Sequence, residues 1–202
     1  MPRYLEFAAK EKRNINWDGI RDVPMPGCMV RDLNVTPIKG IADNSYDGIY
    51  SEHFIEHLEK DRGDALLREC FRILKPGGTI RTVWPAMEFV DRLLSSEDMS
   101  NHPFVVHYYQ RYILQENFAR LKPSHYKRKQ DACAEGLLYQ KGEHKYLWSV
   151  IELQSKLRHL GFKKVKEGQY GQSKVPEFNN IETPGIIREM HSGVVEAQKP
   201  WA

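Results

Sequence analysis

The feature that most constrains the fold is a strand–helix–strand pattern between residues 46 and 84. Tyr46–Tyr50 is typical of a short strand, and Thr79–Trp84 of a second strand rich in β-branched residues. Between them, apolar residues recur at helical spacing, namely Leu66, Cys70, Ile73 and Leu74. Lys75-Pro76-Gly77-Gly78 should end that helix, because proline cannot continue it and glycine permits a sharp reversal. Such a βαβ unit has a right-handed crossover and predicts a parallel sheet.

Shorter segments extend this sheet on both sides of the unit. We expect strands at Arg3–Ala8, at Asn14–Trp17 ending in Asp18-Gly19, and at Met29–Leu33, with closing strands at 162–166 and 193–197. Ser149 and Glu152 form a capping box, which predicts a helix that stops at Gly161. The whole chain, 1–202, is expected to form one domain. In it, residues 86–148 form a helical insertion that caps the substrate.

Composition excludes several classes of protein. The 202 residues are 41% apolar, so the chain is long and apolar enough to bury a core. Its three cysteines are widely spaced without a CxxC pair, which argues against a disulfide framework and a cysteine zinc site. No segment has the length of a membrane span, and residues 1–13 lack a signal-peptide core, so we expect a cytoplasmic protein. A net charge of +3 is too mild to indicate nucleic acid by itself.

The stretch HFIEH, residues 53–57, fits the pattern H-x-x-E-H of some zinc enzymes. A zinc site of that type needs the motif inside a long helix and a third ligand downstream. Here the motif directly follows a strand, and the long helix begins only near Glu59. We therefore assign no metal ligand and keep a zinc hydrolase as the minority hypothesis.

Four stretches carry a resemblance to a known family. The stretches are NSYDGIYSEHFIEHL, RECFRILKPGGTIRTVWP, LRHLGFKKV and GVVEAQK. They resemble class I S-adenosylmethionine-dependent methyltransferases, and in particular a subgroup of small type 11-like methyltransferases. The tail YGQSKVPEFNNIE is also similar to that subgroup, which is often linked to sugar or surface-polysaccharide pathways. The resemblance implies an α/β, Rossmann-like fold: a mostly parallel twisted sheet with helices on both faces.

The resemblance also implies a set of cofactor-binding positions at the strand ends. They are Glu6, Ala8, Asp18, Asp32, Leu33, Tyr50, Ser51 and Glu52. Asp18, at the end of the second strand, would bind the ribose hydroxyls, although a loop carboxylate is as often a turn or cap residue. His53 is the candidate proton acceptor, because an imidazole titrates near neutral pH, although a lone histidine is more often structural.

One departure from the family lies after the first strand. The family has an acidic residue followed by a Gly-x-Gly loop, whereas this chain has Glu6 followed by Phe7-Ala8-Ala9-Lys10. A residue other than glycine in a left-handed conformation costs roughly 1–2 kcal/mol. The added side chains either block the cofactor or, in the case of Lys10, pair with its carboxylate.

The leading hypothesis is thus a methyltransferase that uses S-adenosylmethionine to methylate a small molecule, such as a sugar or polysaccharide precursor. A catalytically degenerate binding protein on the same fold is its strongest rival. A nucleic-acid methyltransferase, using the basic aromatic stretch 107–129, is a third hypothesis that we do not favour. The run SHYKRKQ within it is a solvated face or attracts an anionic substrate. We expect no membrane partner, and a homodimer stays open.

Overall fold

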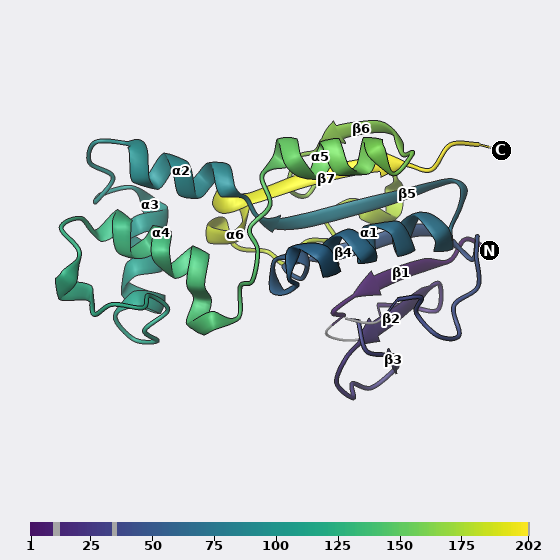
Figure 1. Cartoon of the computed structure of the whole chain (residues 1–202), viewed down its shortest axis with the longest axis horizontal. Helices are drawn as coiled ribbons and strands as arrows, with labels where there is room; N and C mark the ends of the chain where they lie inside the picture. Colours follow the sequence, from purple (N-terminus) through teal and green to yellow (C-terminus); the bar gives the residue numbers. More distant parts are fainter. Residues whose placement is uncertain (10–12, 34–35, 202) are drawn as a thin grey trace.

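The computed structural model describes residues 1–9, 13–33 and 36–201 of the chain. Its framework is a seven-stranded sheet with the spatial order β3-β2-β1-β4-β5-β7-β6 (Figure 1). The strands are β1 (Tyr4–Phe7), β2 (Trp17–Arg21), β3 (Cys28–Val30), β4 (Tyr46–Glu52), β5 (Leu74–Pro85), β6 (Lys163–Glu167) and β7 (Ser192–Gln198). The first five pair in parallel, and β7 runs antiparallel to its neighbours β5 and β6. The predicted parallel βαβ unit and the mostly parallel sheet are therefore confirmed.

Six α-helices accompany the sheet in the described part of the chain: α1 (Lys60–Ile73), α2 (Met87–Ser95), α3 (Pro103–Tyr108), α4 (Lys129–Tyr139), α5 (Val150–His159) and α6 (Ile186–His191). The predicted cap of α5 is present, since the Ser149 hydroxyl accepts a hydrogen bond of 3.1 Å from the Glu152 amide. The reciprocal half of the capping box is wrong, because the Glu152 carboxylate instead contacts Lys60 and Tyr146. None of the described helices combines the length and the apolar character needed to cross a membrane.

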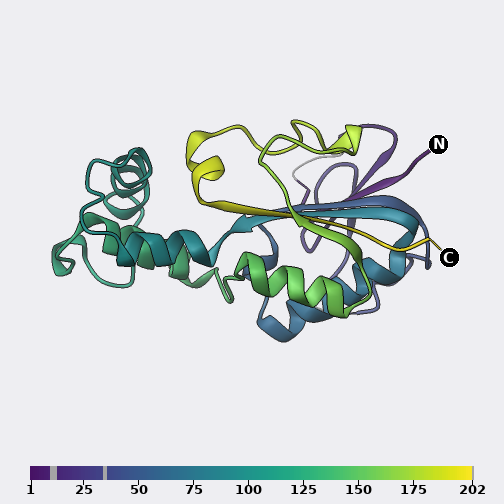
Figure 2. The same cartoon turned by 90° about the horizontal axis from the view of Figure 1, so that it is seen from above.

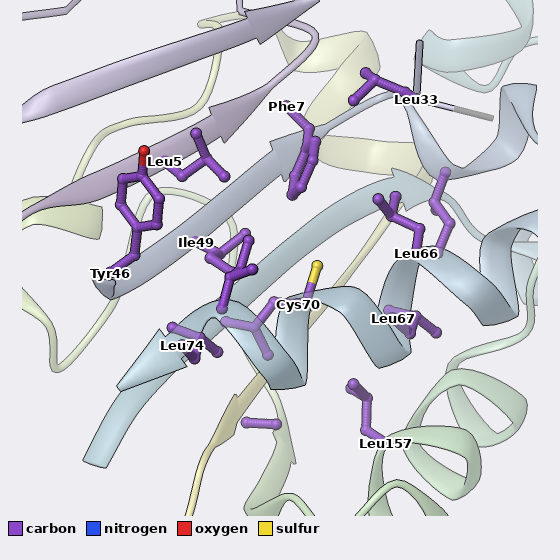
Figure 3. Close-up of a cluster of buried hydrophobic side chains, with 14 of the residues drawn as sticks. Leu5, Phe7, Leu33, Tyr46, Ile49, Leu66, Leu67, Cys70, Leu74 and Leu157 are labelled. Atoms are coloured by element: carbon purple, nitrogen blue, oxygen red, sulfur yellow. The ribbon is translucent and has the colours of Figure 1, made fainter. Parts of the chain in front are cut away.

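The two faces of the sheet are covered differently. Helices α1 and α5 lie against one face, and Figure 2 shows both on the same side of the strands. Their buried side chains, among them Leu66, Leu67, Cys70 and Leu157, pack on Leu5 and Ile49 of the sheet (Figure 3). The opposite face is covered by the tail segment 168–185, and the short helix α6 lies on that side as well (Figure 2). Phe178 of the tail is fully buried there, among Tyr4, Trp17 and Tyr50.

Residues 86–148 form a separate helical lobe beside the sheet. Helices α2, α3 and α4 enclose a core of their own, which includes Phe89, Phe104, Tyr108, Cys133 and Leu137. Figure 1 shows the arrowheads of β1 and β5 pointing toward this lobe. The lobe therefore stands at the carboxyl edge of the parallel strands, where the loops of such sheets bind ligands.

The predicted position of Asp18 is wrong. The second strand begins at Trp17 and ends at Arg21, so Asp18 lies near its amino end. Its carboxylate accepts hydrogen bonds from Arg3 at 2.6 Å and from the Tyr46 hydroxyl at 2.9 Å. Asp18 therefore lies at the edge of the sheet opposite the lobe, and it cannot contact a ligand at the carboxyl ends of the strands.

Candidate functional site

A cavity of about 560 Å³ opens at the carboxyl ends of β1, β2 and β4. Glu6, Ala8, Arg21, Glu52 and His53 line it from the sheet side. The tail closes the other side with Asn180–Pro184 and Arg188. Its volume lies within the range of about 300–1,000 Å³ that small-molecule sites occupy. We call it the strand-end cavity.

The loop after β1 has the left-handed turn that a glycine would normally supply. Ala8 has φ of 54°, and it lines the cavity. The Glu6 carboxylate receives two hydrogen bonds from the Arg13 guanidinium, at 2.6 and 2.7 Å. Arg13 thereby brings a positive charge to the cavity beside the acidic residue that the family carries at this position. Lys10 lies outside the described residues, so its two predicted alternatives stay open.

Arg21, the last residue of β2, is the site residue that sequence reasoning missed. One guanidinium nitrogen donates to the Ala9 carbonyl at 3.1 Å. The buried Nε has no hydrogen-bond partner among residues 1–9, 13–33 and 36–201. A buried donor without a partner is costly, so a ligand oxygen at this point would satisfy it. A sequence prediction that ended the second strand at Arg21 would have placed this residue at the site.

The residues predicted after β3 lie apart from the cavity. Asp32 is exposed and lines a smaller hollow of about 210 Å³ with Arg31, Pro37 and Lys39. Leu33 is buried in the main hydrophobic core. Neither lines the strand-end cavity, and their predicted contact with adenine stays a prediction.

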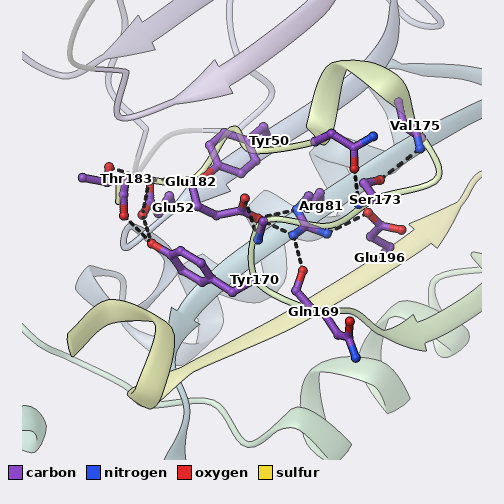
Figure 4. A network of polar contacts seen from close by, with 12 residues as sticks. Tyr50, Glu52, Arg81, Gln169, Tyr170, Ser173, Val175, Glu182, Thr183 and Glu196 are labelled. Carbon is purple, nitrogen blue, oxygen red and sulfur yellow. Dashed lines mark hydrogen bonds and ion pairs between the residues drawn. The ribbon is translucent and has the colours of Figure 1, made fainter. Parts of the chain in front are cut away.

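The end of β4 anchors the tail through Glu52 (Figure 4). The carboxylate, on a side chain only 7% exposed, accepts hydrogen bonds from the Thr183 amide at 3.1 Å, the Thr183 hydroxyl at 2.9 Å and Arg188 at 3.2 Å. The Tyr50 hydroxyl lies 3.2 Å from it, whereas Ser51 is buried within the sheet. Glu52 thus holds the tail wall and positions Arg188 at the cavity.

A second, deeper network fixes the same tail. Arg81 of β5 is completely buried, and its guanidinium contacts Glu182, Glu196 and the Gln169 carbonyl, the last two at 2.8 Å (Figure 4). A buried cation is tolerated only when it is paired and hydrogen-bonded, as Arg81 is here. The contact with Glu182 joins the strand to the cavity-lining part of the tail.

His53 directly follows β4 with a left-handed backbone, φ 50°. Its Nε2 lies 3.1 Å from the Ser192 hydroxyl, and its ring meets the His191 ring edge-on with 5.3 Å between centroids. Burial lowers the pKa of His53 well below its usual value, and the positive neighbours His191 and Arg188 lower it further. The imidazole is therefore neutral at pH 7, and its lowered pKa makes it a weaker base than a free imidazole.

His53 also lines a second cavity of about 470 Å³, which lies between the helical lobe and α6. We call it the lobe cavity. Its wall combines aromatic rings with cations, including Tyr108, Tyr112, Phe118, Arg111 and Arg188. His53, Pro184 and Arg188 line both cavities. Arg111 belongs to the basic aromatic stretch 107–129, whereas Arg188 carries no sequence motif, and the fold brings both to this cavity.

The HFIEH stretch does not lie inside a long helix. Ile55–His57 forms one 3-10 turn, and α1 begins only at Lys60, as the sequence indicated. Glu56 and His57 gather with His144 of the distant segment before α5, and His53 is not part of this group. Burial raises the pKa of Glu56 to about 8 and lowers that of His144 to about 4.

Comparisons with known proteins concern the fold that carries this site. The family model described as a methyltransferase domain matches residues 4–82. An S-adenosylmethionine-dependent methyltransferase from Archaeoglobus fulgidus superposes with a TM-score of 0.54 at 16% identity, over 98% of this chain and 86% of that one. A Thermotoga maritima protein described as a possible histamine N-methyltransferase gives a TM-score of 0.51 at 16% identity, over 98% and 82%.

Some similar structures are longer than this chain. The chain spans about half the length of two of them, a carbon methyltransferase and an S-adenosylmethionine-dependent methyltransferase in its apo form. No curated protein matches the sequence. At these identities the solved structures show the fold alone, which this chain shares with the methyltransferases that superpose on it, and the methyltransferase-domain model matches residues 4–82, less than half of the chain.

Proposed function

We propose that this chain, a class I S-adenosylmethionine-dependent methyltransferase by its fold and by the domain match of residues 4–82, methylates a small anionic molecule in the lobe cavity. The supporting observation is that the strand-end and lobe cavities share His53, Pro184 and Arg188. Ligands in the two cavities would therefore meet at His53. The helical lobe 86–148 then acts as the substrate cap.

The strand-end cavity fits the cofactor S-adenosylmethionine in place, volume and charge. Arg21, with its unpartnered Nε, is the residue that would hold the carboxylate of the cofactor. Glu6 and Ala8 line the adjoining loop. We expect no carboxylate contact to the ribose from Asp18, which lies at the other edge of the sheet. When bound, the cofactor supplies a methyl group on a sulfonium centre, which needs no further activation by the protein.

His53 is the proposed proton acceptor. A hydroxyl or amine acceptor loses a proton when it is methylated, and a neutral imidazole at the junction of the cavities can take it. The Ser192 hydroxyl fixes the orientation of the imidazole through Nε2. Arg188 holds the acceptor at the same junction, and its own position is fixed by Glu52.

The lining of the lobe cavity indicates the class of the methyl acceptor. Arg111 and Arg188 present guanidinium groups, which bind phosphate or carboxylate well. Tyr108, Tyr112 and Phe118 present flat apolar surfaces to a ring. A phosphorylated sugar or polysaccharide precursor has both features. The cavity has the size of a small molecule, so we propose no nucleic-acid substrate, while the homodimer and the cytoplasmic location stay predictions.

One observation favours a second candidate, a binding protein without catalysis. The loop after β1 carries Ala8 in place of glycine, and the carboxyl end of β2 carries the cation Arg21 instead of an acidic residue. Such a protein would bind the cofactor or its demethylated product without transferring a methyl group.

Calorimetry with S-adenosylhomocysteine tests the proposed cofactor site. We expect binding by the wild type and roughly 10- to 150-fold weaker binding by Arg21→Met, since loss of a charge-assisted hydrogen bond costs about 1.5–3 kcal/mol. Arg68→Met, on the exposed face of α1, is the matched control and should bind like the wild type. Absence of binding at millimolar ligand refutes the proposal.

Transfer of a radiolabelled methyl group to a panel of sugar phosphates and nucleotide-linked sugars then separates the two candidates. Transfer that depends on Arg111 supports the methyltransferase. If the protein binds the cofactor but transfers a methyl group neither to the panel nor to the matched neutral sugars, the degenerate binding protein is favoured.

A further inference from the structure

A buried cluster of metal-ligating side chains lies behind the 3-10 turn that follows β4. Glu56 and His57 come from this turn, and His144 comes from the segment between α4 and α5. One ligand atom from each residue lies within 4.8 Å of the others. The main chain supports this approach, because the Lys145 and Tyr146 amides donate to the Glu56 carbonyl at 2.8 and 3.2 Å.

Glu56 is buried without the partners that a carboxylate needs. Its side chain has no exposed surface, and neither oxygen has a hydrogen-bond partner among the described residues. The nearest imidazole nitrogens, of His53 and His57, lie 3.5 and 3.9 Å from Oε1. These distances exceed good hydrogen-bond lengths, so neither imidazole donates a good hydrogen bond to the carboxylate. Burying an ionised group in this way costs several kcal/mol unless a proton or a cation neutralises it.

His144 is oriented as a metal-binding histidine. Its Nδ1 lies within hydrogen-bonding distance of the Leu137 carbonyl, and because a carbonyl oxygen only accepts, Nδ1 carries the proton. The lone pair is therefore on Nε2, which is buried and has no partner within the part of the chain that the structure describes. Metal-bound histidines commonly donate their other nitrogen to a main-chain carbonyl.

His57 completes the group from the 3-10 turn. Its ring lies edge-on to the His144 ring, with 5.1 Å between centroids and 82° between planes. The two imidazoles therefore lie side by side at the carboxylate of Glu56, and His144 is held from outside the cluster by the Leu137 carbonyl.

We propose that Glu56, His57 and His144 bind one Zn²⁺ ion. Two imidazole nitrogens and one carboxylate oxygen are a common ligand set for zinc, with a water molecule in the fourth position of the tetrahedron. The ion would neutralise the buried Glu56 and satisfy Nε2 of His144. It would also join the turn after β4 to the segment before α5, so its main effect is to stabilise the fold.

This set differs from the one that the sequence motif suggested. The H-x-x-E-H reading takes both histidines from residues 53–57, whereas His53 faces Ser192 and His191. His144 is the ligand that no spacing in the sequence indicated, because it is brought in by the fold. The site is separate from the two cavities, since none of the three ligands lines either of them.

The test is elemental analysis of untagged full-length protein after loading with ZnCl₂ and extensive dialysis. The wild type should retain one zinc per chain, whereas Glu56→Gln, His57→Ala and His144→Ala should each lose it. His125→Ala, an exposed histidine outside the cluster, is the matched control and should keep the zinc. Retention of the same zinc content by all variants, or no zinc in the wild type, overturns the proposal.

A second measurement covers variants that fail to fold. Addition of Zn²⁺ to chelator-treated wild type should raise its thermal midpoint, because binding to the native state stabilises it. Glu56→Gln keeps the shape of the side chain without the charge, so it should fold and show no such rise. An equal rise in wild type and Glu56→Gln contradicts the proposal. A Glu56 carboxylic-acid band in the infrared spectrum that persists in excess Zn²⁺ also contradicts it, because a proton then fills the role of the ion.

Discussion

Replacing Arg81 with methionine should destabilise the protein strongly. The substitution keeps the volume of the side chain in the core but removes the cation that contacts Glu182, Glu196 and the Gln169 carbonyl. Glu182 is then left buried with only the Gly171 amide at 3.1 Å, while Glu196 keeps Lys166 at 3.1 Å. Removing one partner of a buried pair costs about 3–5 kcal/mol, so we expect a loss of that size in the free energy of unfolding.

Urea denaturation measures this loss. The exposed pair of Arg120 and Glu135, 4.0 Å apart, provides the control, because Arg120→Met should cost less than about 1 kcal/mol. In the double variant Arg81→Met with Glu182→Gln, the uncompensated charge is removed as well, so part of the stability should return. A loss below about 1 kcal/mol for Arg81→Met, or no recovery in the double variant, would refute this account of the network.

Three further predictions concern the site. Ala8→Gly should raise the free energy of unfolding by about 0.5–1 kcal/mol. Glycine relieves the left-handed strain at φ 54°, and this gain exceeds its larger loss of chain entropy on folding. A decrease measured by urea denaturation contradicts this prediction. His53→Asn should lower the methyl-transfer rate about 10²-fold or more with unchanged affinity for S-adenosylhomocysteine, because asparagine tolerates the left-handed backbone but accepts no proton. A parallel loss of affinity points to a structural role instead. Burial lowers the pKa of His191 to about 4, so the unfolded chain binds the proton more tightly than the folded chain. The free energy of unfolding should therefore fall as the pH drops from about 6.5 toward 4, by up to about 3 kcal/mol. His191→Gln should flatten that part of the pH profile, and an unchanged slope rules the explanation out.

The sheet could be predicted from the sequence because its signals are local. The β4–α1–β5 unit follows from apolar spacing, although α1 ends at Ile73 and the predicted stop signal Lys75-Pro76-Gly77-Gly78 already belongs to β5. The bounds of β2 are wrong in the sequence prediction, because Asp18-Gly19 resembles a turn at the end of a strand. In the structure Gly19 is a strand residue, and a Cβ there would lie 2.6 Å from Cys28 Sγ and 2.9 Å from Ala9 Cβ. Close packing rather than chain reversal requires that glycine, and packing between distant segments has no local signal.

The site was predicted only where it lies at a strand end. Glu6, Ala8, Glu52 and His53 follow directly from the ends of β1 and β4, and the structure brings all four to one cavity. The opposite wall comes from the tail and the lobe, through Arg111, Thr183 and Arg188. These residues share neither spacing nor composition, because their proximity depends on how Glu52 and Arg81 hold the tail.

The antiparallel strand β7 has a consequence for how the molecule is assembled during synthesis. Strand β6 pairs with β7 and with no other strand in the described chain, although it precedes β7 in sequence. On a ribosome, β6 therefore leaves the exit tunnel before the strand that must lie between it and β5. Until residues 192–198 emerge, both β5 and β6 present open edges, which are prone to pair with other chains. We expect a nascent chain stalled before residue 192 to depend on chaperones.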